Sequence, residues 1–169
     1  MLYYILLGGN LGDVDGAMRQ AVRRLERVGH VTAISKVVAS PAWGYESASE
    51  FHNAVLALES ELSPTEVLKF AKDLEAEFGR KPKTPAEGYA DRPLDIDILF
   101  AADEVIDSEA LTVPHPRLHL RRFTLVPLAE LAPALVHPVL GKNVAELLSE
   151  CPDQGDVRVV GDLFPCFEQ

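Results

Sequence analysis

Hydrophobic residues recur along the chain with a period of two or of about 3.6, and each period predicts a different element. Residues 2–7 form a short apolar run that ends at a pair of glycines, which indicates a buried strand. Two β-branched, alternating stretches over 31–39 and 51–58 predict strands that pair as a hairpin. A further alternating stretch over 94–100 predicts another strand.

Two longer segments carry apolar residues at spacings of three and four, as an amphipathic helix does. Asp13 can cap the N-terminus of the first helix, and Gly29 stands where its C-terminal cap is expected. The second helix begins at residues 63–66, where Ser-Pro-Thr-Glu combines a capping box with proline at the first helical position. Gly79 is the expected end of this second helix.

The predicted order is strand, helix, strand, strand, helix, strand, followed by shorter elements. Short helices are expected over 123–131 and 143–148, and 157–160 is a candidate extra strand. This order predicts the α+β class, a ferredoxin-like sandwich with a mainly antiparallel sheet flanked by helices. We expect a single domain over 1–150 and a C-terminal extension of unknown role over 151–169.

Composition restricts the environment and the partners of the chain. Its 169 residues suit one domain, and 16 Lys and Arg against 26 Asp and Glu give a net charge of −10, which argues against nucleic-acid binding. No apolar run is long enough for a signal peptide or a spanning helix, so no membrane partner is expected. Cys151 and Cys166 lie too near the end to frame the fold, and free thiols favour a cytoplasmic location.

Two irregular stretches, 41–50 and 79–93, are long for a compact domain, and loops of that length are often functional lids. The second carries a local group of basic residues: Arg80, Lys81, Lys83 and Arg92. On an acidic protein this group indicates an anionic ligand, although a solvated loop that uses lysines for solubility is an equal alternative.

The strand over 94–100 contains a pair of acidic residues at alternate positions. Because side chains alternate along a strand, Asp95 and Asp97 share one face and lie about 7 Å apart. Two carboxylates at that spacing suit one or two hard cations, above all Mg²⁺. An exposed strand with alternating acids is the commoner explanation of an isolated pair, but Arg92 and the basic loops favour a cation site.

A basic segment follows at 113–123, where five of the eight residues from His115 to Arg122 are Arg or His. The guanidinium group is a planar, permanently charged fork that suits phosphate oxygens. Together with the acidic strand, this segment describes a site for Mg²⁺ and a polyphosphate. Taken alone, the segment could equally be the solvated start of a surface helix.

Phe51 and Asn53 share a strand face, where one can stack on a planar heterocycle and the other can hydrogen-bond its edge. A core phenylalanine with a turn asparagine is the commoner explanation of one such pair. Trp43 lies in a loop, as lid aromatics do. Glu75 is either a surface acid or a group that orients a nearby arginine or metal-bound water.

The glycine-rich residues 7–13 lie between a strand and a helix, where a phosphate-binding loop is possible. They lack the Gly-Lys-Ser/Thr ending of a Walker A loop. Their spacing alone therefore predicts only a tight turn.

Taken together, the motifs resemble the 6-hydroxymethyl-7,8-dihydropterin pyrophosphokinase family of folate biosynthesis, over about residues 2–135. The blocks that carry the resemblance are 7–13, 51–54, 75–80, 92–99 and 111–115, followed by Arg121 and Phe123. The Arg-x-Leu-Asp-Ile-Asp-Ile-Leu block and the Val-Pro-His block are the most specific of these.

The resemblance implies transfer of diphosphate from ATP to the hydroxymethyl group of 6-hydroxymethyl-7,8-dihydropterin, with release of AMP, by a monomer. It implies two Mg²⁺ ions on Asp95 and Asp97, which would act in catalysis with Arg80 and Arg92. The implied ATP-binding residues are Arg80, Arg92, Ile98, Leu111, Thr112, His115 and Arg121. The implied pterin-binding residues are Ser40, Pro41, Ala42, Trp43, Phe51, Asn53, Asp95 and Phe123.

The chain departs from the family pattern at Ala110 and Pro116, and Tyr89 replaces the frequent tryptophan of the second loop. Two other functions remain as alternatives. A non-catalytic nucleotide- or pterin-binding regulator is disfavoured by retention of both aspartates with the basic residues. A divalent-metal phosphohydrolase is disfavoured by the pair of Phe51 and Asn53.

Overall fold

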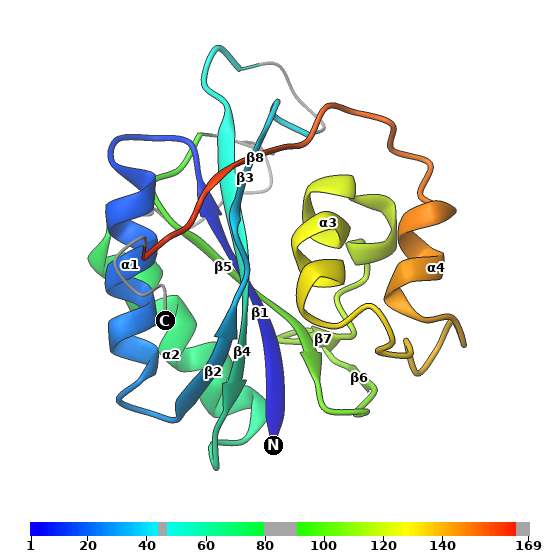
Figure 1. Cartoon of the computed structure of the whole chain (residues 1–169). Coiled ribbons are helices and arrows are strands. Elements are labelled where there is room, and N and C mark those ends of the chain that lie inside the picture. The colour runs from blue at the N-terminus through cyan, green and yellow to red at the C-terminus, as the bar shows by residue number, and fades with distance from the viewer. Residues whose placement is uncertain (44–46, 80–90, 165–169) are drawn as a thin grey trace.

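A computed structural model describes residues 1–43, 47–79 and 91–164, and six of its strands form one sheet (Figure 1). These strands are β1 (Leu2–Gly9), β2 (His30–Ile34), β3 (Val37–Ser40), β4 (Phe51–Glu59), β5 (Asp95–Ala101) and β8 (Arg158–Gly161). Their order is β5-β1-β4-β3-β8, β2 pairs with β4 as well, and every pairing is antiparallel. The prediction of a mainly antiparallel sheet is confirmed.

Helices cover both faces of the sheet (Figure 1). One face packs against α1 (Val14–Leu25) and α2 (Pro64–Glu77), and the other against α3 (Arg122–Leu131) and α4 (Val144–Ser149). A small sheet of β6 (Ile106–Asp107) and β7 (Thr112–Val113) and a 3₁₀ turn (Leu118–Leu120) precede α3. The α+β sandwich with flanking helices is therefore confirmed. No helix in the described ranges has the length and apolar character needed to cross a membrane.

Side chains cap the helices largely where the sequence predicts. The Asp13 carboxylate accepts a hydrogen bond from the Gly16 N–H at 3.0 Å, and Ser63 and Glu66 form a reciprocal capping box. Gly79, with φ of 87°, follows the end of α2. Gly29 does not cap α1, which ends four residues earlier; it lies where a Cβ would be 2.3 Å from the Glu59 carbonyl oxygen.

The single strand predicted over 31–39 is two strands, because residues 35 and 36 leave the regular ladder. Ser35 donates its N–H to the Val55 carbonyl at 2.8 Å, and its hydroxyl oxygen accepts the Val55 N–H at 2.8 Å. The Lys36 N–H donates to the Glu130 carboxylate on α3 instead of to a strand. At this point the Ser35 hydroxyl and a carboxylate on α3 thus accept hydrogen bonds that backbone carbonyls would accept in a regular strand ladder.

β1 is longer than predicted, because it continues through both glycines instead of turning at them. Gly8 pairs with Asn53 of β4 on one side and with Asp95 of β5 on the other. The candidate strand over 157–160 is present as β8, and it pairs with β3.

The register places the ends of four strands together. Where β1 and β3 end, β4 and β5 begin, so Asn53, Gly8 and Asp95 lie side by side across three strands. Ser40 pairs with Phe51 at the same edge. Because side chains alternate along a strand, those of Ser40, Phe51, Asn53 and Asp95 point to the face of the sheet that α3 covers.

Candidate active site

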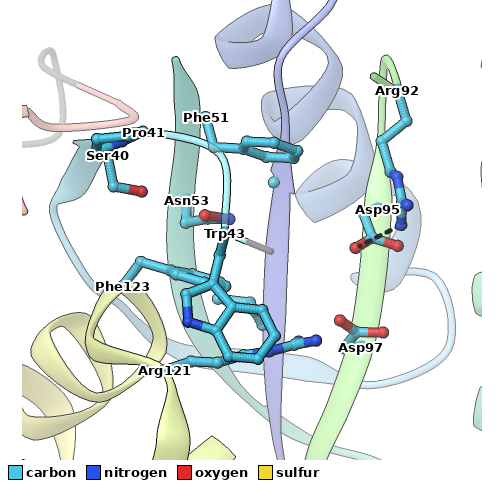
Figure 2. A pocket seen from close by; sticks show the side chains of 12 residues that line it. Ser40, Pro41, Trp43, Phe51, Asn53, Arg92, Asp95, Asp97, Arg121 and Phe123 are labelled. Atoms are coloured by element: carbon cyan, nitrogen blue, oxygen red, sulfur yellow. Dashed lines mark ion pairs between the residues drawn. The ribbon is translucent and has the colours of Figure 1, made fainter. Parts of the chain in front are cut away.

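A cavity opens at this end of the sheet, beside the start of α3 (Figure 2). Its walls are formed by Leu6, Gly8, Ser40, Pro41, Trp43, Phe51, Asn53, Arg92, Asp95, Asp97, Arg121 and Phe123. All of these except Leu6 and Gly8 were expected from the sequence. The two motifs that were inferred separately, one for a metal–polyphosphate and one for a heterocycle, therefore line one cavity.

The acidic part of the cavity lies on the edge strand β5. Asp95 and Asp97 project from the same face, while Ile96 is buried in the core on the opposite side. Arg92 forms an ion pair with Asp95, with 3.4 Å between Nη1 and Oδ2 (Figure 2). The Glu75 carboxylate on α2 accepts the Ile96 N–H at 2.7 Å. Glu75 therefore holds the backbone of β5 between the two aspartates, a role that neither interpretation of the sequence included.

The donor set of this strand fits Mg²⁺. Magnesium is usually held by one or two carboxylates, with water and substrate phosphate oxygens completing its coordination. Asp95 and Asp97 provide such a pair at the cavity wall. Within residues 1–43, 47–79 and 91–164, no cluster of three or more His, Cys, Asp or Glu could form a closed metal site.

Arg121 lies at the start of α3 between two aromatic rings. Its guanidinium carbon is 4.8 Å from the centre of the Trp43 ring and 5.7 Å from that of Phe123. Burial lowers the pKa of Arg121, and the nearby Asp97 opposes this shift, so the group stays a cation at neutral pH. Its Nε is buried with no hydrogen-bond acceptor in the described structure. A phosphate oxygen would supply one.

The opposite wall carries the aromatic and amide groups. Phe51 and Phe123 lie on either side of Asn53 in the view of Figure 2. Ser40 and Asn53 are 3% and 4% exposed, and neither Ser40 Oγ nor Asn53 Oδ1 has a hydrogen-bond partner in the described structure. Buried polar atoms without partners are costly. These two atoms therefore mark where a ligand with polar edges would bind.

Gly8 makes room for this amide. A Cβ at position 8 would lie 2.0 Å from Asn53 Nδ2 and 2.9 Å from the His52 carbonyl oxygen. Only glycine lets the Asn53 side chain lie across β1 towards Asp95. Gly8 is one of the glycines in the block 7–13, but its role could not be recognised from the sequence, because that role depends on the pairing of β1 with β4.

The residues implied for ATP binding are not all on this cavity. Ile98 and Leu111 are buried in the core beneath α1 and α2, and Thr112 and His115 line a neighbouring hollow. Ala42 is absent from the lining of the cavity. Arg80, Lys81, Lys83 and Tyr89 lie outside the described residues, as do most of the second loop and residues 44–46 of the first.

His115 is not the cationic group that the basic segment suggested. Burial, aided by the positive charge of Arg121, lowers its pKa to about 4. Its Nδ1 accepts the Arg117 N–H at 3.1 Å, which leaves the proton of the neutral ring on Nε2. His115 can therefore give a phosphate a neutral hydrogen bond, whereas Arg92 and Arg121 supply positive charge.

The low pKa of His115 predicts a pH dependence of stability. The unfolded chain takes up this proton near pH 6.5 and the folded protein only near pH 4, so acidification through this range favours unfolding. Between pH 7 and pH 5 the free energy of unfolding should fall by roughly 2 kcal/mol more in the wild type than in His115→Gln. Urea unfolding at both pH values measures this difference. Equal losses in the two proteins would mean that His115 is not buried as described.

An acidic pair beside two arginines, facing an aromatic and amide pocket, is a set of groups suited to a metal-bound polyphosphate and a planar heterocycle. The chain belongs to the family described as 7,8-dihydro-6-hydroxymethylpterin-pyrophosphokinase, whose model matches residues 4–133.

Named relatives agree with this assignment. The chain is 40% identical over 147 residues to the 2-amino-4-hydroxy-6-hydroxymethyldihydropteridine pyrophosphokinase of Aquifex aeolicus (strain VF5), covering 87% of this chain and 90% of that one. It is 38% identical over 130 residues to the protein of the same name from Bacillus subtilis (strain 168), covering 76% of each.

A solved structure supports the fold. The wild-type HPPK-DHPS of Plasmodium falciparum with SDX-DHP has a TM-score of 0.72 and 15% identity to this chain. The match covers 88% of this chain and 44% of that longer one, so the chain spans less than half the length of that protein.

Proposed function

We propose that this protein transfers diphosphate from ATP to the hydroxymethyl group of 6-hydroxymethyl-7,8-dihydropterin and releases AMP, a step of folate biosynthesis. The observation that carries the proposal is the row of Asn53, Gly8 and Asp95 across three strands. This row puts a group that can recognise a pterin edge next to a group that can hold a metal-bound phosphate.

In the proposed complex the pterin ring stacks between Phe51 and Phe123. The unpartnered Oδ1 of Asn53 accepts a hydrogen bond from the amino or amide edge of the ring. Ser40, Pro41 and Trp43 line the same half of the cavity. The exocyclic hydroxymethyl group then faces Asp95 and Asp97.

We place ATP with its phosphates at Arg92 and Arg121, with Arg80 as a further expected contact, and with its adenosine towards Thr112 and His115, which line the neighbouring hollow. Asp95 and Asp97 would hold two Mg²⁺ ions, whose charge would neutralise the phosphates and favour attack by the hydroxymethyl oxygen. The new bond joins that oxygen to the β-phosphorus, and the bond from the β-phosphorus to the AMP oxygen breaks. The protein contributes positioning and positive charge more than acid–base chemistry.

One assay tests the function and separates it from the two alternatives. The full chain is incubated with ATP, Mg²⁺ and 6-hydroxymethyl-7,8-dihydropterin, and AMP is measured. We expect AMP only when all three are present. Hydrolysis of ATP without the pterin would indicate a phosphohydrolase, and binding of both ligands without AMP would indicate a regulator. We expect the active enzyme to elute as a monomer in gel filtration.

Asn53→Ala should weaken pterin binding by about 5- to 150-fold, because it leaves buried ligand groups without a partner at a cost of about 1–3 kcal/mol. The affinity for MgATP should change little, because Asn53 lies on the other side of Gly8 from Asp95. Calorimetric titration of each ligand separately measures both effects.

His52→Ala is the matched control for this variant. His52 is the neighbouring residue of β4, but its Nδ1 lies 2.8 Å from Asp15 Oδ1 on α1, at the opposite face of the sheet. It should leave pterin affinity unchanged. If Asn53→Ala weakened MgATP as much as the pterin, Asn53 would have a structural role and the proposed pocket would be misplaced.

A further inference from the structure

The chain after α4 crosses from the helices on one face of the sheet to β8 at the edge of the sheet (Figure 1). This crossing segment, residues 151–163, is buried at both of its ends. Cys151 packs in the core beneath α3 and α4, and Leu163 packs in the core beneath α1 and α2. The Leu163 carbonyl oxygen accepts a hydrogen bond from Arg19 Nη1 at 3.2 Å. The crossing segment lies outside residues 4–133, which the family model matches, and the sequence assigned no role to it.

The crossing segment first contacts the start of α3. Asp153 Oδ2 accepts the Arg122 N–H at 3.1 Å, while its Oδ1 accepts the Gly155 N–H at 2.9 Å. The side chain at the N-cap of α3, that of Arg121, forms no capping hydrogen bond, so Asp153 satisfies the first N–H of the helix in its place. Because Arg122 lies between Arg121 and Phe123, which both line the cavity, Asp153 fixes the backbone that carries one wall of the site.

The crossing segment then contacts the residue that precedes β4. Arg158 on β8 binds the Glu50 carboxylate with both terminal nitrogens, at 2.9 Å and 2.8 Å, and its Nη1 also donates to Asp156 Oδ2 at 3.1 Å. Two parallel hydrogen bonds between a guanidinium and a carboxylate fix direction as well as distance. Glu50 directly precedes Phe51, which lines the cavity on the other side of Asn53 from α3 (Figure 2). One segment therefore holds both aromatic walls.

We propose that Asp153 and Arg158 are positioning residues that set the distance between Phe51 and Phe123 for the pterin ring. Arg158 is five positions after Asp153. Because a chain extends by at most about 3.6 Å per residue, this short link limits how far the start of α3 can move from the start of β4. The distance matters, since a gap of about 0.5–1 Å at one face of a ring forfeits roughly a quarter to a half of the contact attraction there.

This inference rests on the proposed function, because it requires that the pterin binds between the two rings. Calorimetric titration of the full chain with 6-hydroxymethyl-7,8-dihydropterin tests it. Asp153→Ala should weaken binding about fivefold and Arg158→Ala about threefold, as expected for loss of a helix cap and of a partly exposed ion pair. In Arg158→Ala, kcat at saturating pterin and MgATP should stay within about twofold of the wild type, because Asp95 and Asp97 are on β5, at the opposite end of the strand order from β8.

The double variant Asp153→Ala/Arg158→Ala distinguishes one link from two local effects. Each single substitution releases one end of the same link. Together they should therefore weaken pterin binding no more than Asp153→Ala does, whereas independent losses of fivefold and threefold would multiply to about 15-fold.

The two carboxylates that Arg158 binds provide a matched pair of variants. Glu50→Ala breaks the contact with the residue before β4 and should weaken pterin binding as much as Arg158→Ala does. Asp156→Ala removes a carboxylate that lies within the crossing segment itself, so it should keep the wild-type affinity. Arg158 and Glu50 are both nearly half exposed, so their variants are expected to fold, and thermal unfolding of every variant verifies this.

Several outcomes would overturn the proposal. One is an unchanged pterin affinity in Asp153→Ala and Arg158→Ala, and another is multiplied losses in the double variant. An equal loss in Asp156→Ala would also overturn it, because the effect would then not depend on the contact with Glu50. These results would leave the proposed function intact, whereas a wild-type protein that does not bind the pterin would refute the proposed function itself.

Discussion

Asp97→Ala will lower kcat by about 1,000-fold or more, which is roughly 4 kcal/mol of transition-state stabilisation. The reason is that Asp97 is one of the two carboxylates that the described residues place on the cavity wall, where they can hold a metal-bound phosphate. The apoprotein should remain folded, because removal of one of two neighbouring like charges relieves repulsion. Single-turnover measurement of AMP formation, together with thermal unfolding of the apoprotein, tests both parts.

Two variants control this experiment. Asp97→Asn keeps the shape of the side chain and removes its charge, so it should lose nearly as much activity as the alanine variant. Asp73→Ala removes an exposed carboxylate of α2 that pairs only with Lys69 among the described contacts, and it should be fully active. An Asp97→Ala protein that retains most of its activity, or that unfolds, would contradict the metal assignment.

Gly8→Ala should weaken pterin binding by about 100-fold or more while the sheet still forms. The added methyl group would overlap the Asn53 amide, at 2.0 Å from Nδ2, and would push it out of the position between Phe51 and Phe123. An amide at the end of a side chain can move, whereas the strand pairing of Gly8 uses only the backbone. Calorimetric titration of the pterin measures the loss, and amide hydrogen exchange of β1 and β4 verifies the sheet.

The double variant Gly8→Ala/Asn53→Ala isolates the cause. If the methyl group acts through Asn53, removing the amide leaves only its close approach to the His52 carbonyl oxygen, at 2.9 Å, and the double variant should bind the pterin no more weakly than Asn53→Ala. The effects of the two substitutions are then far from additive. Additive effects would show that Gly8 acts on the pterin by some other route.

The sequence predicted the elements whose causes are local. Apolar alternation in 94–100 is sufficient to put Asp95 and Asp97 on one face, because the period of a strand does not depend on its neighbours. The capping box at Ser63 and Glu66 also uses only nearby atoms, and the structure confirms it. The residues that line the cavity were predicted with few omissions because their chemical types, taken as blocks, are specific to one family.

The elements were predicted wrongly where contacts with distant residues determine the structure instead of the local sequence pattern. The strand predicted over 31–39 breaks at Ser35. The Ser35 hydroxyl accepts the Val55 N–H in place of a backbone carbonyl, and the Glu130 carboxylate accepts the N–H of the following residue, Lys36. Gly8 continues a strand because β4 and β5 pair with it on both sides. The periodicity of the sequence contains no information about these contacts between distant residues.

By itself, the sequence determined the α+β class, the strand face with two aspartates, and the presence of arginines and aromatic residues suited to a phosphate and a heterocycle. Tertiary structure alone decided that Gly8 lies between Asn53 and Asp95, and that Glu75 holds the edge of β5. It also decided that His115 is neutral, since its pKa depends on burial and on Arg121. Residue type and local period are properties of the chain, whereas register, burial and electrostatic surroundings arise only when distant segments pack together.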